Sequence, residues 1–163
     1  MKIDEQETKH KKRLLVAFAH PDDESFGIAG TLARYVDEGV GVHLICATNG
    51  DVGTADPEFM RSYESVAHLR LAELRCAEQA LGLSSVITLG YRDSGMAGSP
   101  DNEHPDSLVS VDLDMVAEHI TYVIRKLRPQ VVVTFDPVGG YGHPDHIAVH
   151  RATVRAFERA GDP

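Results

Sequence analysis

Four short apolar runs, separated by segments with helical spacing, constrain the fold of this chain more than any other feature. The runs cover residues 14–19, 40–47, 85–89 and 131–135, and each has the length of a strand buried inside a sheet. The segments 28–38, 63–81, 112–127 and 144–159 carry apolar residues at helical spacing. Strands that alternate with helices form parallel sheets through right-handed crossovers. We therefore predict an α/β fold, a Rossmann-like sandwich with a mainly parallel central sheet and helices on both faces.

Two segments of this pattern carry further expectations. The fourth run begins with three valines, which is typical of a strand buried on both of its faces. Residues 91–110, before the third helix, are rich in Gly, Asp, Ser and Pro. A stretch of this length without a strand or helix pattern is either a functional loop or a disordered segment.

Length and charge limit the domain organisation and the partners. A chain of 163 residues, 42% of them hydrophobic, can bury one sizeable core, so we predict a flexible charged tail at residues 1–12 and one domain at residues 13–163. The 25 acidic and 16 basic residues give a net charge of −9, which disfavours nucleic acid and anionic membranes as partners. The tail lacks the apolar segment of a secretion signal, and no apolar run is long enough to span a bilayer, so we expect a cytoplasmic protein.

The cysteines and the missing motifs narrow the chemistry. Cys46 and Cys76 fall in a predicted strand and a predicted helix without the spacing of a metal or redox motif, and we interpret both as buried thiols in a reducing compartment. The chain has no GxGxxG after its first strand, no GxxxxGK[ST] and no GxSxG. These absences argue against dinucleotide, P-loop and α/β-hydrolase chemistry.

Residues that can bind a metal follow the first and the fourth predicted strands. The run HPDDE occupies residues 20–24, and GYGHPDH occupies residues 140–146. Because the carboxyl ends of central parallel strands meet in one crevice, we expect His20, Asp22, Asp23, His143 and His146 to lie together. Two histidines and one aspartate supply the three ligands of a catalytic zinc site. The other aspartate is then free to act as a general base, and the spacing does not say which of the two it is.

The motifs of this chain resemble those of a known enzyme family. AHPDDE at residues 19–24, TNGDVG at 48–53, the helix with Arg70 and Glu73, and GYGHPDH at 140–146 resemble the LmbE-like or PIG-L-like zinc-dependent N-deacetylases. YRDSGMAG at 91–98 and TFDPVGGYGHPDH at 134–146 are most similar to actinobacterial enzymes of mycothiol metabolism, which deacetylate a GlcNAc-inositol or cleave mycothiol conjugates. The resemblance implies a hydrolase that removes an acetyl group from an N-acetylglucosamine-type substrate.

The resemblance also implies how the two motifs divide the chemistry. His20, Asp23 and His146 match the family's metal ligands, for zinc or for another divalent metal such as iron. Asp22 matches the general base. His146 and His150 would share one face of a helix, as in HExxH sites, but the resemblance favours His146 alone as the ligand.

Other positions match residues that handle the substrate. His143 matches the residue that stabilises the oxyanion and assists the leaving amine, with Asp145 as its orienting partner. Tyr141 matches a mobile tyrosine that polarises the substrate carbonyl. Arg70 and Asp93 match positions that contact the sugar or its attached group.

Each of these assignments has a structural alternative. His143 and Asp145 are suited to capping the last helix, since acidic groups favour the first helical turn. Arg70 is three residues from Glu73 and can pair with it on the helix surface. Asp93 fits an ordinary loop.

Two features depart from the family pattern. Asp51 stands where the family usually has the Glu of Thr-x-Gly-Glu, which shortens an acid at the rim of the pocket. Family members commonly continue beyond the last predicted helix, so we expect a domain that is incomplete and a sheet that is short at the C-terminus. The alternatives to a deacetylase are therefore a mycothiol-conjugate-type amidase, or a zinc-binding domain without turnover. As partners we expect an N-acetylated amino sugar or its conjugate and a second copy of the chain in a homo-oligomer.

Overall fold

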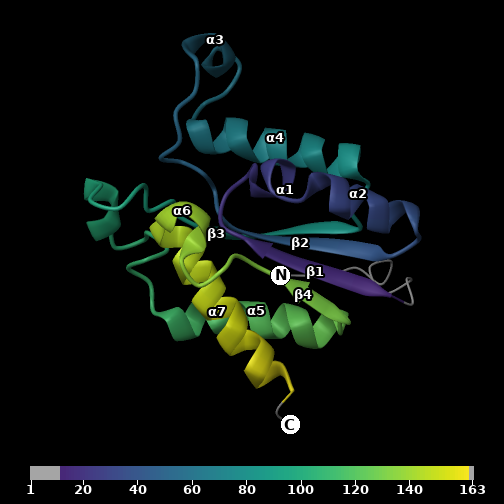
Figure 1. Ribbon diagram of the computed structural model, residues 1–163. Coiled ribbons are helices and arrows are strands. Elements are labelled where there is room, and N and C mark those ends of the chain that lie inside the picture. The colour runs from purple at the N-terminus through teal and green to yellow at the C-terminus, as the bar shows by residue number, and fades with distance from the viewer. Residues whose placement is uncertain (1–11, 162–163) are drawn as a thin grey trace.

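A sheet of parallel strands forms the centre of the molecule (Figure 1). The computed structural model describes residues 12–161, so the predicted tail, apart from Lys12, lies outside the described residues. Within them the strand order is β3-β2-β1-β4, and every neighbouring pair is parallel. The strands are β1 (Arg13–Phe18), β2 (Gly41–Thr48), β3 (Ser85–Tyr91) and β4 (Val131–Val133). The predicted α/β fold with a parallel sheet is confirmed.

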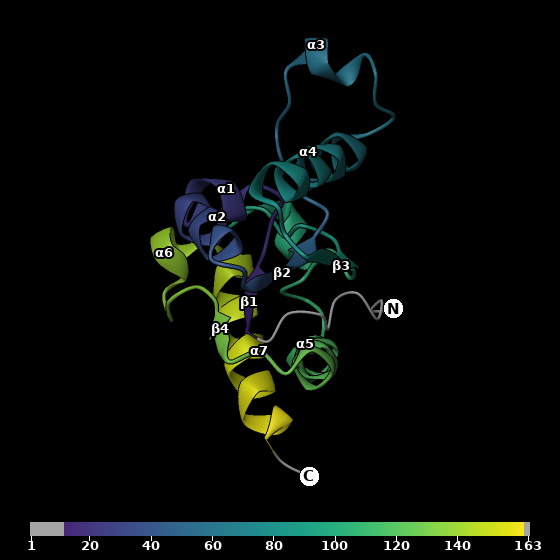
Figure 2. The same ribbon diagram turned by 90° about the vertical axis from the view of Figure 1, so that its right-hand side faces the viewer.

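Helices cover both faces of the sheet because alternate side chains of each strand point to opposite sides. Leu15 and Ala17 of β1 pack into one core cluster with α5 (Leu113–Leu127) and α7 (Pro144–Ala160). Leu14 and Val16 pack into a second cluster with α2 (Ala29–Asp37) and α4 (Val66–Leu81). Figure 2 shows the strands between these two pairs of helices.

Four short helices lie at one end of the sheet. They are α1 (Asp23–Phe26), α3 (Pro57–Met60), the 3-10 helix η2 (Pro100–Glu103) and α6 (Gly139–Gly142). Each follows the carboxyl end of a different strand, in the order β1, β2, β3 and β4. Together they surround the end at which parallel α/β sheets bind their ligands.

Capping residues set the ends of the long helices. The helix predicted from residue 63 begins at Val66, because the Ser65 hydroxyl accepts the backbone N–H of His68 at 3.2 Å and so ends the preceding loop. It stops at Gly82, whose φ of 67° is easily adopted by glycine. Pro144 occupies the first position of α7, where its missing N–H costs nothing.

The fourth strand is shorter and more exposed than predicted. It contains only Val131–Val133, and Val131 is 50% exposed, so the expectation of a strand at 131–135 buried on both faces is wrong. The reason is its place at the edge of the described sheet, where only β1 pairs with it. The chain then leaves the sheet, although the Thr134 hydroxyl still donates to the Ala17 carbonyl at 3.0 Å.

The long segment after β3 is a folded loop. The N–H of Arg92 donates to Asp106 at 3.1 Å, and the N–H of Leu108 donates to the Arg92 carbonyl at 3.0 Å. The Asn102 amide donates to the Ser94 carbonyl at 2.5 Å, and Leu108 is buried in the core. Of the two alternatives for residues 91–110, the disordered one is therefore wrong.

The two cysteines differ in their surroundings. Cys46 is buried in β2, as expected, whereas Cys76 lies exposed on α4, so the prediction of two buried thiols is wrong for Cys76. The cause is the face of α4 that residue 76 occupies, since the buried side of this helix is formed by Leu69 and Leu74. Among residues 12–161, no helix combines the length and the apolar character needed to cross a bilayer.

Candidate active site

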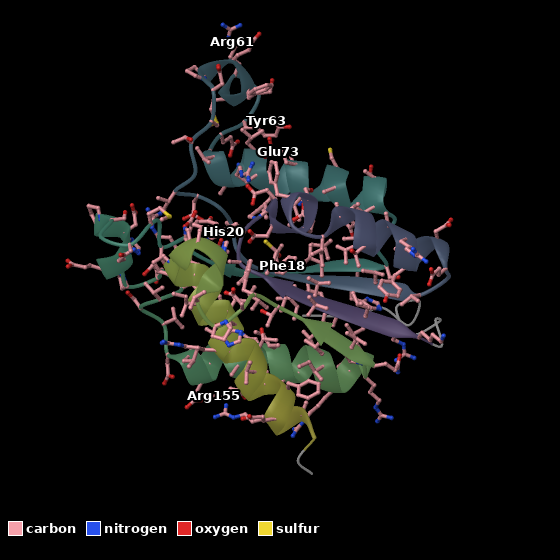
Figure 3. All side chains as sticks on the ribbon, in the orientation of Figure 1. Phe18, His20, Arg61, Tyr63, Glu73 and Arg155 are labelled. Atoms are coloured by element: carbon pink, nitrogen blue, oxygen red, sulfur yellow. The ribbon has the colours of Figure 1, made fainter. Side chains whose placement is uncertain are left out.

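The two sequence motifs meet beyond the carboxyl ends of β1 and β4. These strands are neighbours, with Val16 opposite Val133, so the loops that follow them start side by side. Figure 3 shows His20 beyond Phe18, where the chain leaves β1 on the side of α6. The rings of His20 and His143 are 4.5 Å apart between centroids, although the residues lie in different motifs.

Three side chains present ligand atoms to one point. The Nδ1 atom of His20 lies 3.2 Å from the Nε2 atom of His146. One carboxylate oxygen of Asp23 is 3.6 Å from the His20 nitrogen, and the other is 3.3 Å from the His146 nitrogen. Zinc ligands at about 2.0–2.2 Å in a tetrahedron are separated by roughly 3.3–3.6 Å. The spacing of these three side chains therefore fits a zinc ion.

Further carboxylates surround this group. On the far side of the His20 ring, Nε2 lies 3.0 Å from Asp145 and 3.6 Å from Asp93. Burial opposes protonation of His20, but the three surrounding carboxylates outweigh it and raise the pKa of His20 to about 12. One oxygen of the fully buried Asp145 has no hydrogen-bond partner among the described residues. The concentration of negative charge in a buried place favours a cation there.

Two other groups of side chains could also hold a metal, since the possible ligand atoms within each group lie within 4.8 Å of one another. One is His20, His143 and His146, and the other is His20, Asp93, His143 and Asp145. Both include His143, whose Nδ1 accepts the backbone N–H of Asp145 at 3.2 Å and so has only Nε2 available. The group with Asp23 has a carboxylate oxygen beside each of the two facing histidine nitrogens, and one of these oxygens also accepts the backbone N–H of His20 at 2.8 Å. We therefore favour the group that contains Asp23.

The two adjacent aspartates point in different directions. Asp23 faces the histidines, whereas the Asp22 carboxylate accepts a hydrogen bond from the Arg70 guanidinium of α4. Burial raises the pKa of Asp22 above its ordinary value, and the positive charge of Arg70 opposes that rise. Arg70 also donates to the Pro21 carbonyl and pairs with Glu73 at 2.5 Å. The helix-surface pair predicted for Arg70 therefore forms, and the same guanidinium contacts Asp22, whereas its contact with the sugar stays a prediction.

His143 and Tyr141 lie on the other side of the histidine pair. His143 caps α7 and is buried, so the capping interpretation and a place in the site are both satisfied. Burial, followed by the charge of nearby His20, lowers the pKa of His143. Tyr141 is 69% exposed, and its ring centroid is 5.2 Å from that of His146.

Asp93 belongs to the loop after β3 and is drawn into the site. Its carboxylate accepts the Gly95 N–H at 2.8 Å in addition to its contact with His20. Burial opposes ionisation, but these two contacts lower the pKa of Asp93 to about 2. The next residue, Ser94, donates its backbone N–H to Asp145 at 2.9 Å and ties the loop to α7.

A cleft of about 490 Å³ opens in front of these residues. Its wall also contains Val52, Thr54 and Met96, which sequence reasoning did not single out. Phe135 was missed as well, although its ring stacks on His146 with centroids 3.9 Å apart. Val52, Met96 and Phe135 lie inside the quoted motifs, but apolar residues after strands are common in any α/β protein, so their residue type did not mark them as part of the site.

His150 lies outside the ligand group. Its Nδ1 lies 2.7 Å from the carbonyl oxygen of Phe135, in the segment that follows β4, and forms a hydrogen bond with it. The structure therefore brings together every residue predicted for the site, while His150 remains a neighbour of the backbone.

Comparisons with known proteins agree on one family. A family model described as "PIG-L: GlcNAc-PI de-N-acetylase" matches residues 15–157. A 1D-myo-inositol 2-acetamido-2-deoxy-alpha-D-glucopyranoside deacetylase from Thermobifida fusca is 44% identical over 161 residues, covering 93% of this chain and 56% of the relative. A protein of the same name from Geodermatophilus obscurus is 45% identical, with 93% and 55% covered. These relatives are thus almost twice as long as the part of them that this chain matches.

A solved structure supports the same relationship. It is an N,N'-diacetylchitobiose deacetylase from Pyrococcus horikoshii, superposes with a TM-score of 0.74 and is 30% identical. The match covers 93% of this chain and 51% of that one. The fold is therefore that of a known group of proteins.

Proposed function

The chain belongs to the PIG-L de-N-acetylase family, and we propose that it hydrolyses the acetamide of an N-acetylglucosamine-type substrate. Family membership confirms the resemblance seen in the motifs. One observation carries the proposed activity: the facing nitrogens of His20 and His146 lie 3.2 Å apart, and the Asp23 carboxylate places one oxygen 3.6 Å from the first and its other oxygen 3.3 Å from the second, beside the separate Asp22 carboxylate at the cleft. The names of the two bacterial relatives support a GlcNAc-inositol as the substrate.

We propose zinc as the cofactor, held by His20, Asp23 and His146. Two imidazoles and one carboxylate form an open catalytic site for zinc, with a coordination position left for water or substrate. A bound zinc ion would supply Lewis acidity and make water a stronger acid. Asp145 would keep Nε2 of His20 hydrogen-bonded and its ring oriented, with the charge of Asp93 at 3.6 Å beside it.

The remaining residues divide the proton transfers. Asp22 accepts the proton of the attacking water, and its raised pKa brings it closer to neutral pH than an ordinary aspartate. Arg70 holds this carboxylate in place. His143 donates a hydrogen bond from Nε2 to the oxyanion and so assists departure of the amine, which takes up the proton that Asp22 removed from water, while Asp145 orients the histidines. Tyr141, at the open side of the cleft, polarises the acetamide carbonyl.

The experiment that tests this function measures both products. The zinc-loaded chain is incubated with a GlcNAc-inositol, and the free amine and acetate are quantified. We expect the two products in equal amounts, their loss after treatment with a chelator, and recovery when zinc is returned. Zinc binding without product from any N-acetylglucosamine-type substrate would contradict the proposal and favour a domain without turnover. Cleavage of mycothiol conjugates in place of acetamides would favour the amidase.

The loops at the rim of the cleft provide a separate prediction. Arg92 precedes Asp93 in the chain and forms two ion pairs. It pairs with Asp51 at 3.3 Å and with Asp101 of η2 at 2.5 Å, and so links the loops after β2 and β3. Partly exposed ion pairs contribute about 0.2–1 kcal/mol each, so Arg92→Ala should loosen both loops without unfolding the chain. We expect KM to rise about three- to tenfold with little change in kcat, measured by steady-state kinetics. Arg75→Ala, at an exposed position of α4, is the control, and a fall in kcat at unchanged KM would contradict this role.

We also propose that the reaction takes place in the cytoplasm. Cys46 and Cys76 are both free thiols, which fits a reducing compartment. The proposed substrate is a small polar molecule, which agrees with the charged side chains of Asp22, Arg70 and Asp93 in the wall of the cleft.

A further inference from the structure

The backbone of Asp22 has a conformation that residues with a side chain rarely adopt. Its φ is 130° and its ψ is −24°. Among residues 12–161, Arg128 is the only other residue apart from glycine with a positive φ. Such a conformation persists only where surrounding contacts hold it in place. The structure must therefore contain a group that holds Asp22.

Glu24 supplies that contact from a buried position. Its side chain is 1% exposed, which is unusual for a carboxylate. One oxygen accepts the backbone N–H of Asp22 at 3.1 Å, and the other accepts the Ser25 hydroxyl at 2.6 Å. A hydrogen bond from a backbone N–H to a carboxylate oxygen is among the stronger contacts available to that N–H.

The start of α1 shows what this contact achieves. Asp22 is the N-cap residue, and its carbonyl accepts the N–H groups of Ser25 and Phe26 at 2.8 and 3.0 Å. An aspartate at this position ordinarily uses its own carboxylate to cap the helix. Here the side chain makes no capping bond and turns toward Arg70. Glu24 instead bonds back to the N–H of the cap residue, as the acidic residue of a capping box does.

We propose that Glu24 is a positioning residue that holds the backbone of Asp22 and so directs the Asp22 carboxylate into the cleft. This inference rests on the proposed role of Asp22 as the general base. The essential property of Glu24 is then a hydrogen-bond acceptor at a fixed place. A neutral acceptor of the same shape should preserve part of the effect, and an apolar side chain should not.

The test compares Glu24→Leu with Glu24→Gln in the zinc-loaded full chain. For Glu24→Leu we expect kcat to fall on the order of 10- to 100-fold, because small displacements of a reacting group are costly. KM should change by less than about twofold, since the substrate contacts remain. Glu24→Gln should lose several-fold less, because its amide oxygen can still accept the Asp22 N–H. Glu38→Leu, at the exposed end of α2, is the matched control.

A purely structural role of Glu24 would produce a different pattern. Zinc content, thermal stability, KM and kcat would then all deteriorate together. In an Asp22→Asn background we expect Glu24→Leu to cost less than about twofold in addition, since its effect passes through Asp22. Equal losses in both backgrounds, equal losses for Leu and Gln, or full activity of Glu24→Leu would each overturn the inference. Full activity of Asp22→Asn alone would overturn the proposed base, and this inference with it.

Hydrogen exchange provides a readout that needs no turnover. In the unaltered metal-free chain, NMR should show slow exchange of the Asp22 N–H, because its hydrogen bond to Glu24 must open first. The exchange should accelerate in Glu24→Leu. Exchange of the Asp22 N–H at the rate of a free peptide in the unaltered chain would overturn the inference even if the leucine variant does not fold.

Discussion

Replacing Asp22 by Asn is expected to lower kcat on the order of 10²- to 10⁴-fold while the zinc content stays unchanged. The carboxylate faces Arg70 and the cleft and is no part of the His20, Asp23 and His146 group, so metal binding does not depend on it. The amide oxygen of Asn can still accept from Arg70, which keeps the loop in place. What is lost is the ability to take up the proton of the attacking water.

Three measurements together check this expectation. Steady-state kinetics give kcat, metal analysis gives the zinc content, and thermal unfolding shows whether the fold is intact. Asp37→Asn, the same change at an exposed position of α2, should behave like the unaltered chain. A variant Asp22→Asn that binds zinc and hydrolyses N-acetylglucosaminides at nearly the normal rate would exclude Asp22 as the base.

Replacing His146 by Gln is expected to remove both zinc and activity. The His146 Nε2 atom lies 3.2 Å from His20 and 3.3 Å from Asp23, so without it only two of the three ligands remain. Glutamine fills much of the space beside Phe135, which limits the loss of packing in this buried place. Zinc should no longer be retained on dialysis, and kcat should fall below detection.

A histidine one turn further along α7 provides the control. His150 contacts the Phe135 carbonyl, so His150→Gln should keep its zinc and lose only about 1 kcal/mol of stability with that hydrogen bond. Binding of Co²⁺, followed by its visible absorption spectrum, reports the coordination without any turnover. A tetrahedral Co²⁺ spectrum in His146→Gln but not in His150→Gln would refute the assignment of His146.

Most of the fold could be predicted because its periodicities are strong. The continuous apolar run of β1 and the helical spacing of α5 depend on local sequence alone, and both appear where expected. The strand after Pro129 was predicted less well. Three valines predict a strand, but the exposure of its side chains depends on whether a second strand pairs with it. Within residues 12–161, β4 pairs only with β1.

Other features escaped prediction because they depend on side-chain contacts and burial that residue type does not specify. Gly, Ser and Asp in residues 91–110 are compatible with a loop of any kind, and Asn102 and Arg92 organise it through bonds that no local pattern encodes. Glu24 stood inside a recognised motif, yet nothing in the sequence marked it as buried. A short acidic run predicts exposed carboxylates, and only the packed structure shows which of them is buried.

The two aspartates after β1 separate what the sequence determines from what depends on the tertiary structure. From the sequence alone came an α/β sheet with histidines and aspartates behind its first and fourth strands, because strand and helix periodicities are local and loops after strands are exposed. Which aspartate faces the histidines was decided by the fold. The backbone of Asp22 is held at a positive φ by Glu24, its carboxylate is held by Arg70 from α4, and Asp23 is left facing His146 from α7. Arg70 and His146 lie 48 and 123 residues along the chain from Asp22 and Asp23 respectively, so only the packed sheet brings these pairs together.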